Sequence, residues 1–192
     1  KKYYQTEASG NMNLKKVKTK SIPTAGVTVS NYTFVLYWNP DFVASLSKKH
    51  FFGLMKHECY HLIYQHVTAR KQTPHNLWNI ATDLAINSLI DPQYLPEGGL
   101  VPGKAFDKDT LTGVPPKIAE RNKKLSDFLK SLPKFKSSEW YMEKIKSDEE
   151  ISEQFEELCQ GFGESGFDVH LDGDGTLTDA DREIMKGKMK EI

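Results

Sequence analysis

The chain lacks the features that mark several classes of protein. It has only two cysteines in 192 residues, which is too few for a disulfide framework. It carries no net charge, and its small basic run, Lys15–Lys20, is typical of a solvated segment, so we expect no nucleic-acid partner. It shows no signal peptide and no apolar run of 18 residues, so we expect a cytoplasmic protein that does not associate with a membrane.

The most informative segment is His57–His61, which has the pattern HExxH inside an apolar stretch without proline. That stretch predicts a helix over about residues 46–69. On a helix the two histidines lie on one face, where their imidazoles can bind one zinc ion together. Glu58 then lies where it can take a proton from a water on the metal. The alternative is a core helix with two ordinarily hydrogen-bonded histidines, which is costly beside a buried carboxylate.

A zinc site of this kind needs a third protein ligand, because catalytic zinc keeps three of them and an open position for water. A histidine ten residues after the first would complete one common pattern, but Val67 occupies that position. A glutamate on the next helix would complete another, but no glutamate occurs between Glu58 and Glu97. The third ligand must therefore be of a different kind.

The next helix, predicted over Pro74–Ile90 with Thr73 as its N-cap, carries one acidic residue, Asp83. Asn79, Asp83 and Asn87 are spaced by four and form one polar stripe on an apolar helix. A stripe facing solvent is the alternative, but solvent faces usually carry lysine and glutamate. A lone carboxylate on a buried helix needs a cation or several donors. The expected zinc ligands are therefore His57, His61 and Asp83.

Several segments resemble a bacterial and phage metallopeptidase domain that is found ahead of von Willebrand factor A-like domains. They are His57–His61 with His66 and Arg70, Leu77–Asn87, Ile22–Val27, Leu36–Phe42, Leu95–Leu100 and Ser138–Tyr141. The resemblance implies a zincin-like fold and a zinc-dependent hydrolase. We also expect four polar residues to orient the ligands. These are His66, Arg70, Asn79 and Asn87.

The expected fold class is α+β, mainly helical, with a small sheet packed on the HExxH helix. Runs rich in β-formers at 27–29 and 33–38 predict a hairpin. In zincins an edge strand holds the extended substrate, and Val35 and its neighbours are candidates for that strand. Further helices are predicted at 119–132, 138–146 and 149–160, the last ending at a glycine.

The chain divides into three parts on this reading. Residues 1–20 are polar and irregular, residues 21–170 form the zincin-like domain, and residues 171–192 form an acidic loop and a helix. Residues 103–135, rich in lysine and proline, look like an insertion in the domain.

The acidic loop resembles a calcium site in spacing but departs from it in chemistry. The candidate calcium-binding residues are Asp172, Asp174, Thr176 and Asp181. His170 stands where such a site begins with aspartate, and Asp181 replaces the usual glutamate, so both changes weaken binding. The alternative is an acidic turn before a helix with Thr178 as its N-cap. His170 and Tyr141 are candidates for stabilising an oxyanion, and His170 cannot serve both purposes.

These observations favour a zinc-dependent metallopeptidase that acts on protein or peptide substrates. Glu58 would act as general base on the attacking water and then as general acid toward the leaving amine. One alternative is a zinc-containing binding or scaffolding module without turnover. Another is a latent peptidase that residues 103–135 block.

Overall fold

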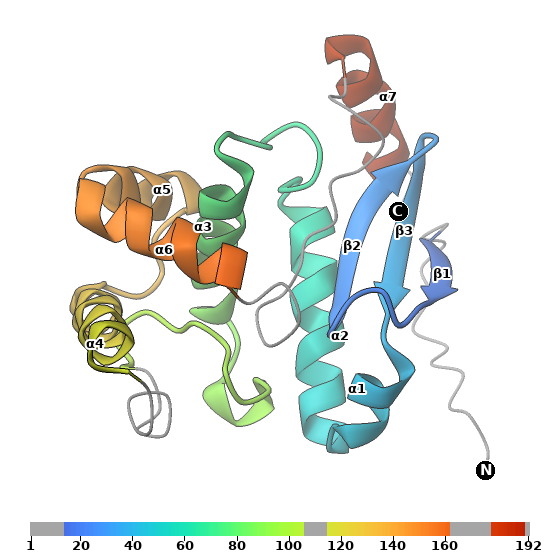
Figure 1. Cartoon of the computed structure of the whole chain (residues 1–192). Helices are drawn as coiled ribbons and strands as arrows, with labels where there is room; N and C mark the ends of the chain where they lie inside the picture. The colour runs from blue at the N-terminus through green and yellow to red at the C-terminus, as the bar shows by residue number, and fades with distance from the viewer. Residues whose placement is uncertain (1–13, 106–114, 162–177, 191–192) are drawn as a thin grey trace.

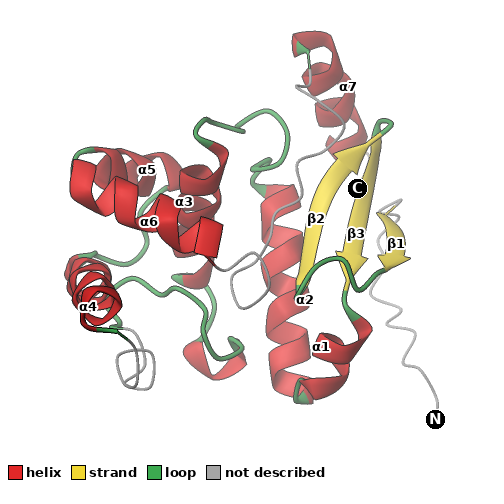
Figure 2. Cartoon of the chain, in the orientation of Figure 1, coloured by secondary structure: helices red, strands yellow, loops and turns green. Residues whose placement is uncertain are grey.

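The computed structural model describes residues 14–105, 115–161 and 178–190. The fold is α+β, as expected, with a small sheet on one side and a group of helices on the other (Figures 1 and 2). Helices α2 and α3 lie between these two parts and contact each other. The elements are β1 (Leu14–Lys18), β2 (Ala25–Ser30), β3 (Thr33–Trp38), α1 (Pro40–Ser45), α2 (Lys48–Ile63), α3 (His75–Asn87), η1 (Pro92–Tyr94), α4 (Pro116–Ser131), α5 (Ser138–Lys146), α6 (Glu149–Gly161) and α7 (Asp179–Lys190).

The expected hairpin is confirmed, and it forms the main part of the sheet. β2 and β3 pair antiparallel from Ala25 opposite Trp38 to Ser30 opposite Thr33. The two linking residues, Asn31 and Tyr32, have φ values of 47° and 55°. Two successive residues with positive φ form the turn whose twist matches that of paired strands.

Two expectations about the sheet were wrong. Residues 14–18, expected to be irregular, form β1, which pairs in parallel with β3. The strand order among the described strands is therefore β1-β3-β2, so Val35 lies in the central strand and not at an edge. The lysines of β1 are exposed, as lysines on an edge strand usually are. With three lysines among its five residues, the segment lacks the apolar alternation that would have predicted a strand.

Three hydrophobic clusters of buried residues occur in the described part of the chain. In the first, apolar residues of the sheet pack against the inner face of α2, and Met185 of α7 is buried among them. In the second, α3, α4, α5 and α6 pack around Trp78, Tyr141 and Phe155, whose side chains are almost fully buried. The third cluster joins the two middle helices, because Tyr60 of α2 packs against a group that contains Ile86 of α3 together with Ile90, Leu95 and Val101.

Helix α2 ends earlier than its apolar pattern predicts. It stops at Ile63, and Gln65 adopts the left-handed conformation with φ of 57°. The N–H groups of Gln65 and His66 donate to the carbonyls of Leu62 and His61, at 3.0 and 2.9 Å. These bonds form a Schellman motif, which closes the helix and turns the chain sharply. The turn brings His66 back beside His61.

Gly53 lets the segment after α3 approach α2 closely. A Cβ atom at this position would lie 1.9 Å from the carbonyl oxygen of Tyr94, in η1. That distance is far shorter than a van der Waals contact. Glycine is therefore required here, and it allows η1 to lie against the helix that carries the histidines.

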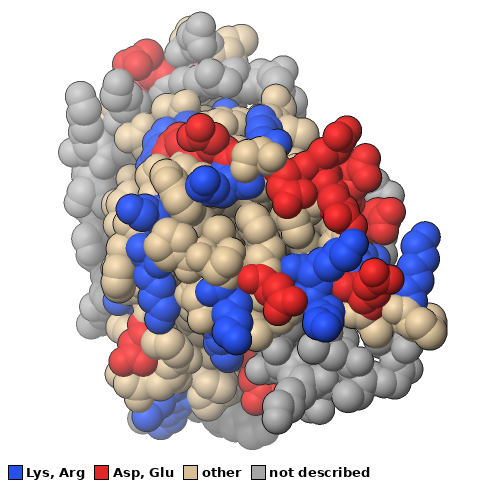
Figure 3. Space-filling view, turned by 90° about the vertical axis from the view of Figure 1, so that its left-hand side faces the viewer, with Lys and Arg blue, Asp and Glu red and all other residues tan. Residues whose placement is uncertain are grey.

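Helix α4 begins at Pro116, three residues before the predicted start, and it belongs to the second core. Leu125 and Leu129 are almost fully buried there, although the helix lies in the segment expected to be an insertion. On the surface, Arg121 forms an ion pair with Glu157 at 3.8 Å, and Lys124 pairs with Glu150. Figure 3 shows that this face of the molecule carries charges of both signs.

The other predicted helices are confirmed. α5 has the predicted bounds, and α6 ends at the predicted glycine. α3 begins later than expected, because Pro74 and not Thr73 occupies the N-cap position. Among the described helices, none combines the length and the apolar character needed to cross a membrane.

Candidate metal centre

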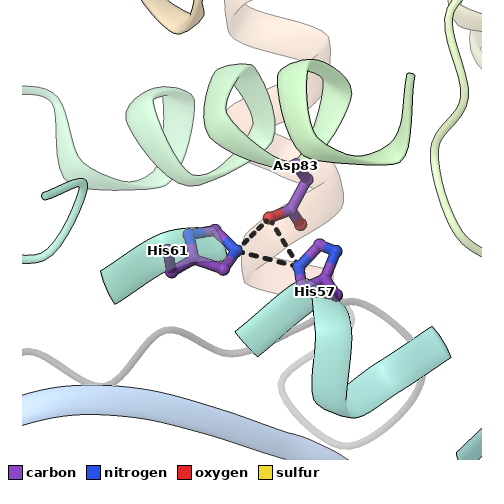
Figure 4. A group of neighbouring side chains, drawn as sticks. All are labelled: His57, His61 and Asp83. Atoms are coloured by element: carbon purple, nitrogen blue, oxygen red, sulfur yellow. Dashed lines mark hydrogen bonds and ion pairs between the residues drawn. The ribbon is translucent and has the colours of Figure 1, made fainter. Parts of the chain in front are cut away.

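Three side chains from the two middle helices converge on one point (Figure 4). α2 places His57 and His61 one turn apart on the same face, and α3 places Asp83 opposite them. The two Nε2 atoms are 2.8 Å apart. Asp83 Oδ1 lies 3.5 Å from His57 Nε2 and 3.3 Å from His61 Nε2. None of the three residues is more than 6% exposed.

The ring of His57 is held from its other side by an amide. His57 Nδ1 lies 2.8 Å from Asn87 Oδ1, and Asn87 Nδ2 donates to the carbonyl of Leu100 at 2.8 Å. Because the amide nitrogen is committed to that carbonyl, the oxygen faces the ring and can only accept. His57 Nδ1 therefore carries the hydrogen, and its Nε2 presents a lone pair to the convergence point.

The ring of His61 is held by a second imidazole. His61 Nδ1 lies 3.4 Å from His66 Nδ1, and His66 Nε2 lies 2.8 Å from Ser138 Oγ at the start of α5. Trp78 Nε1 donates to the carbonyl of His66 at 3.1 Å, which fixes the backbone there. When His61 Nδ1 donates to His66, His61 Nε2 also presents a lone pair to the convergence point.

The donor set and its spacing fit a zinc ion. Two imidazole nitrogens and one carboxylate oxygen are ligands that zinc prefers. Bonds of 2.0–2.1 Å in a tetrahedral arrangement place ligand atoms about 3.3 Å apart. The distances from Asp83 Oδ1 match that spacing, and the two nitrogens lie closer, at 2.8 Å. These three buried atoms lie close enough together to hold one metal ion among them.

Glu58, the residue expected to act as base, follows His57 on α2 and is 1% exposed. Burial and the neighbouring Glu58 carboxylate raise the pKa of the Cys59 thiol. The pKa of a second thiol, Cys159, is raised to about 11, first by burial and then by the carboxylates of Asp83 and Glu156. Both thiols are therefore protonated at neutral pH.

The remaining residues expected to orient the ligands have different surroundings. Asn87 and His66 contact the two histidines directly. Arg70 instead forms a two-bonded ion pair with Glu139, with distances of 2.8 and 2.6 Å, and ties the turn after α2 to α5. The amide of Asn79 contacts His75 at 3.3 Å, one turn earlier on α3.

Two of the oxyanion and calcium candidates, Tyr141 and Asp181, lie among the described residues. The hydroxyl of Tyr141 donates to the carbonyl of Pro133 at 2.7 Å inside the second core, which argues against an oxyanion role. Asp181 accepts bonds from the N–H and hydroxyl of Thr178, and Asp181 N–H donates back to that hydroxyl. This reciprocal cap on α7 matches the alternative of a turn before a helix. The other four candidates, His170, Asp172, Asp174 and Thr176, lie outside the described residues.

Sequence reasoning missed two groups that hold the histidines, the hydroxyl of Ser138 and the carbonyl of Leu100. Ser138 is 1% exposed and lies 72 residues from its partner His66 along the chain. The Leu100 carbonyl belongs to the backbone, which leaves no trace in residue type. Both residues fall in segments that carry the family resemblance, and that resemblance was the only signal available.

One protein family matches the chain over most of its length. Its model, described as a putative metallopeptidase domain, matches residues 8–176. The chain therefore belongs to this family. The matched range contains all three converging residues and also residues 103–135. No curated protein and no solved structure matches the chain.

Proposed function

We propose that this member of the metallopeptidase family is a zinc-dependent peptidase that hydrolyses peptide bonds. The observation that carries the proposal is the buried convergence of His57, His61 and Asp83. The hydrogen bond from His57 Nδ1 to Asn87 supports it, because it leaves Nε2 as a donor to a metal. The HExxH pattern adds a carboxylate next to the first ligand.

The residues of this chain would divide the chemistry among them. His57, His61 and Asp83 would hold the zinc ion. A zinc ion bound there supplies a Lewis acid that polarises a peptide carbonyl and lowers the pKa of a bound water. Glu58 would accept the proton of the attacking water and then donate it to the leaving amine. Because Glu58 is buried, little bulk water competes for that proton.

The first test is the metal content of the purified protein, measured by elemental mass spectrometry. We expect one zinc per wild-type chain and a loss of most of it in Asp83→Ala. The matched control is Asp127→Ala, which removes an exposed carboxylate on α4 and should keep the zinc. Wild-type protein that takes up no zinc when zinc is offered would overturn the proposed centre.

The second test separates a peptidase from a zinc-binding module without turnover. Glu58→Gln keeps the size of the side chain but removes the base, so we expect it to retain zinc and lose peptide hydrolysis by at least a hundredfold. Glu143→Gln, an exposed change on α5, is the control. A zinc-loaded wild type that cleaves no peptide in a diverse library would favour the module.

A further inference from the structure

A cavity of about 130 Å³ lies directly beside the metal centre. His57 and Asp83 form part of its wall, so a group inside it would lie next to the convergence point of Figure 4. The rest of the wall comes from Thr24, from α1, α2 and α3, and from the segment after η1. Among the described residues, the apolar part of the lining consists of Phe42, Leu54, Leu95, Pro96 and Leu100.

Most of the accessible surface of this wall is apolar, and its polar residues are Thr24, His57, Asp83, Asn87 and Glu97. The amide of Asn87 bonds to His57 on one side and to the Leu100 carbonyl on the other. An occupant would therefore meet mostly carbon atoms and would find few hydrogen-bond partners. A negatively charged side chain buried there would lose its water and face the carboxylates of Asp83 and Glu97, which costs far more than burying a methylene group gains. The cavity thus favours an uncharged apolar group.

The size of the cavity sets a limit on that group. A cavity of about 150 Å³ lined by leucine, isoleucine and phenylalanine is known to bind benzene. The cavity here is slightly smaller, at about 130 Å³, and the apolar part of its lining is of the same kind. An isobutyl group or a single six-membered ring is therefore the largest side chain that fits without a change in the wall.

From this geometry we propose that the cavity is a substrate pocket for one residue adjacent to the scissile bond. It would take an apolar side chain of the size of leucine, methionine or phenylalanine. The substrates would then be peptides with such a residue next to the bond that is cleaved. This inference rests on the proposed peptidase function, since it places the scissile carbonyl at the metal centre.

Gly99 offers a way to fill the pocket without disturbing the backbone. A Cβ atom there would lie 3.6 Å from the Pro96 carbonyl and 3.7 Å from Asn87 Nδ2, which are ordinary contacts. Valine at this position would therefore take up part of the space beside Asn87. The matched control is Gly187, which lies on α7 and does not line the cavity. A Cβ atom there would meet nothing within 4 Å.

The experiment measures the binding of amino-acid hydroxamates to the zinc-loaded protein by calorimetry, so it does not depend on turnover. The hydroxamate group binds the metal, and the side chain probes the pocket. We expect leucine and phenylalanine hydroxamates to bind at least tenfold more tightly than glycine and aspartate hydroxamates. Gly99→Val should reduce that preference at least fivefold, Gly99→Ala less, and Gly187→Ala should not change it.

The outcomes separate the two proposals. Equal binding of all four hydroxamates to the wild type would overturn the pocket and leave the zinc centre intact. Failure of every hydroxamate to bind a protein that contains zinc would instead contradict an open metal position, and with it the peptidase. If Gly99→Val is poorly folded by circular dichroism, the wild-type series and Gly99→Ala still decide the question.

Discussion

The two histidines of the candidate metal centre lie one turn apart on the same helix, yet different parts of the molecule hold them. An amide, Asn87, holds the ring of His57, and a backbone carbonyl fixes that amide in turn. Another imidazole, His66, holds the ring of His61, and the other nitrogen of His66 forms a hydrogen bond with the hydroxyl of Ser138. The first support can only accept a hydrogen from its ring, whereas the second can accept or donate.

This difference bears on how the tautomer of each histidine is determined. On the His57 side the protein alone determines which ring nitrogen carries the hydrogen. On the His61 side either hydrogen-bond arrangement satisfies His66, and only one of them leaves Nε2 ready for a metal. We therefore expect His57 to be preorganised, while binding of the metal selects the arrangement at His61. Four changes to the chain test this contrast.

The largest effect is expected for Gly53→Ala, which changes the surroundings of His57 indirectly, through η1. The added methyl group collides with the Tyr94 carbonyl and must displace η1, which lies six residues before the Leu100 carbonyl that fixes Asn87. We expect a loss of about 3 kcal/mol in the free energy of unfolding, measured with urea, together with weaker zinc binding. The control, Gly187→Ala, should stabilise α7 by about 0.5–1 kcal/mol. A Gly53→Ala protein of unchanged stability would mean that the close contact with η1 is not formed.

The second largest effect is expected for Asn87→Ala, which removes the support of His57 directly. The ring loses its acceptor and the Leu100 carbonyl loses its donor, both in a buried place. Loss of such a partner of a metal ligand typically costs about 10- to 100-fold in metal affinity. Competition with a chromophoric chelator measures this. Zinc affinity equal to that of the wild type would show that His57 does not depend on the amide.

A smaller effect is expected for Ser138→Ala, which acts on His61 only through His66. The lost bond contributes about 1 kcal/mol, so zinc affinity should fall about fivefold. Ser138→Thr keeps the hydroxyl and should restore most of the affinity. The contrast with Asn87→Ala would disappear if Ser138→Ala cost as much as that variant, and the two supports would then be equivalent.

The smallest effect is expected from the ion pair of Arg70 and Glu139, which ties the His61 side to α5. The Arg70 guanidinium holds the pKa of the Glu139 carboxyl below its usual value of 4.5. Because the pKa of Glu139 is lower in the folded protein than in the unfolded chain, the pair stabilises the fold fully at a pH above the unfolded-state pKa. This stabilisation is lost as the pH falls through the folded-state pKa. Because the pair is partly exposed, the loss should stay under about 1 kcal/mol. Between pH 6 and pH 3, the free energy of unfolding measured with urea should depend less on pH for Glu139→Gln than for the wild type.

Several features of the fold were predictable because their causes are local. The hairpin depends on two strand-forming runs with a short link between them, and the bounds of α5 follow from a serine cap and the apolar spacing after it. β1 was not predictable, because it depends on pairing with β3 some 20 residues away. The end of α2 was also missed, since no glycine marks the left-handed residue Gln65.

The sequence by itself determined that two imidazoles and a carboxylate belong to one buried polar group. The helix period places His57 and His61 on one face, and a single acidic residue on a buried helix needs a positive partner. Only the tertiary structure decided what holds each ring, and what forms the pocket beside the metal centre. These contacts join residues 30 and 72 positions apart, and they depend on how the hydrophobic clusters bring α2 and α3 together.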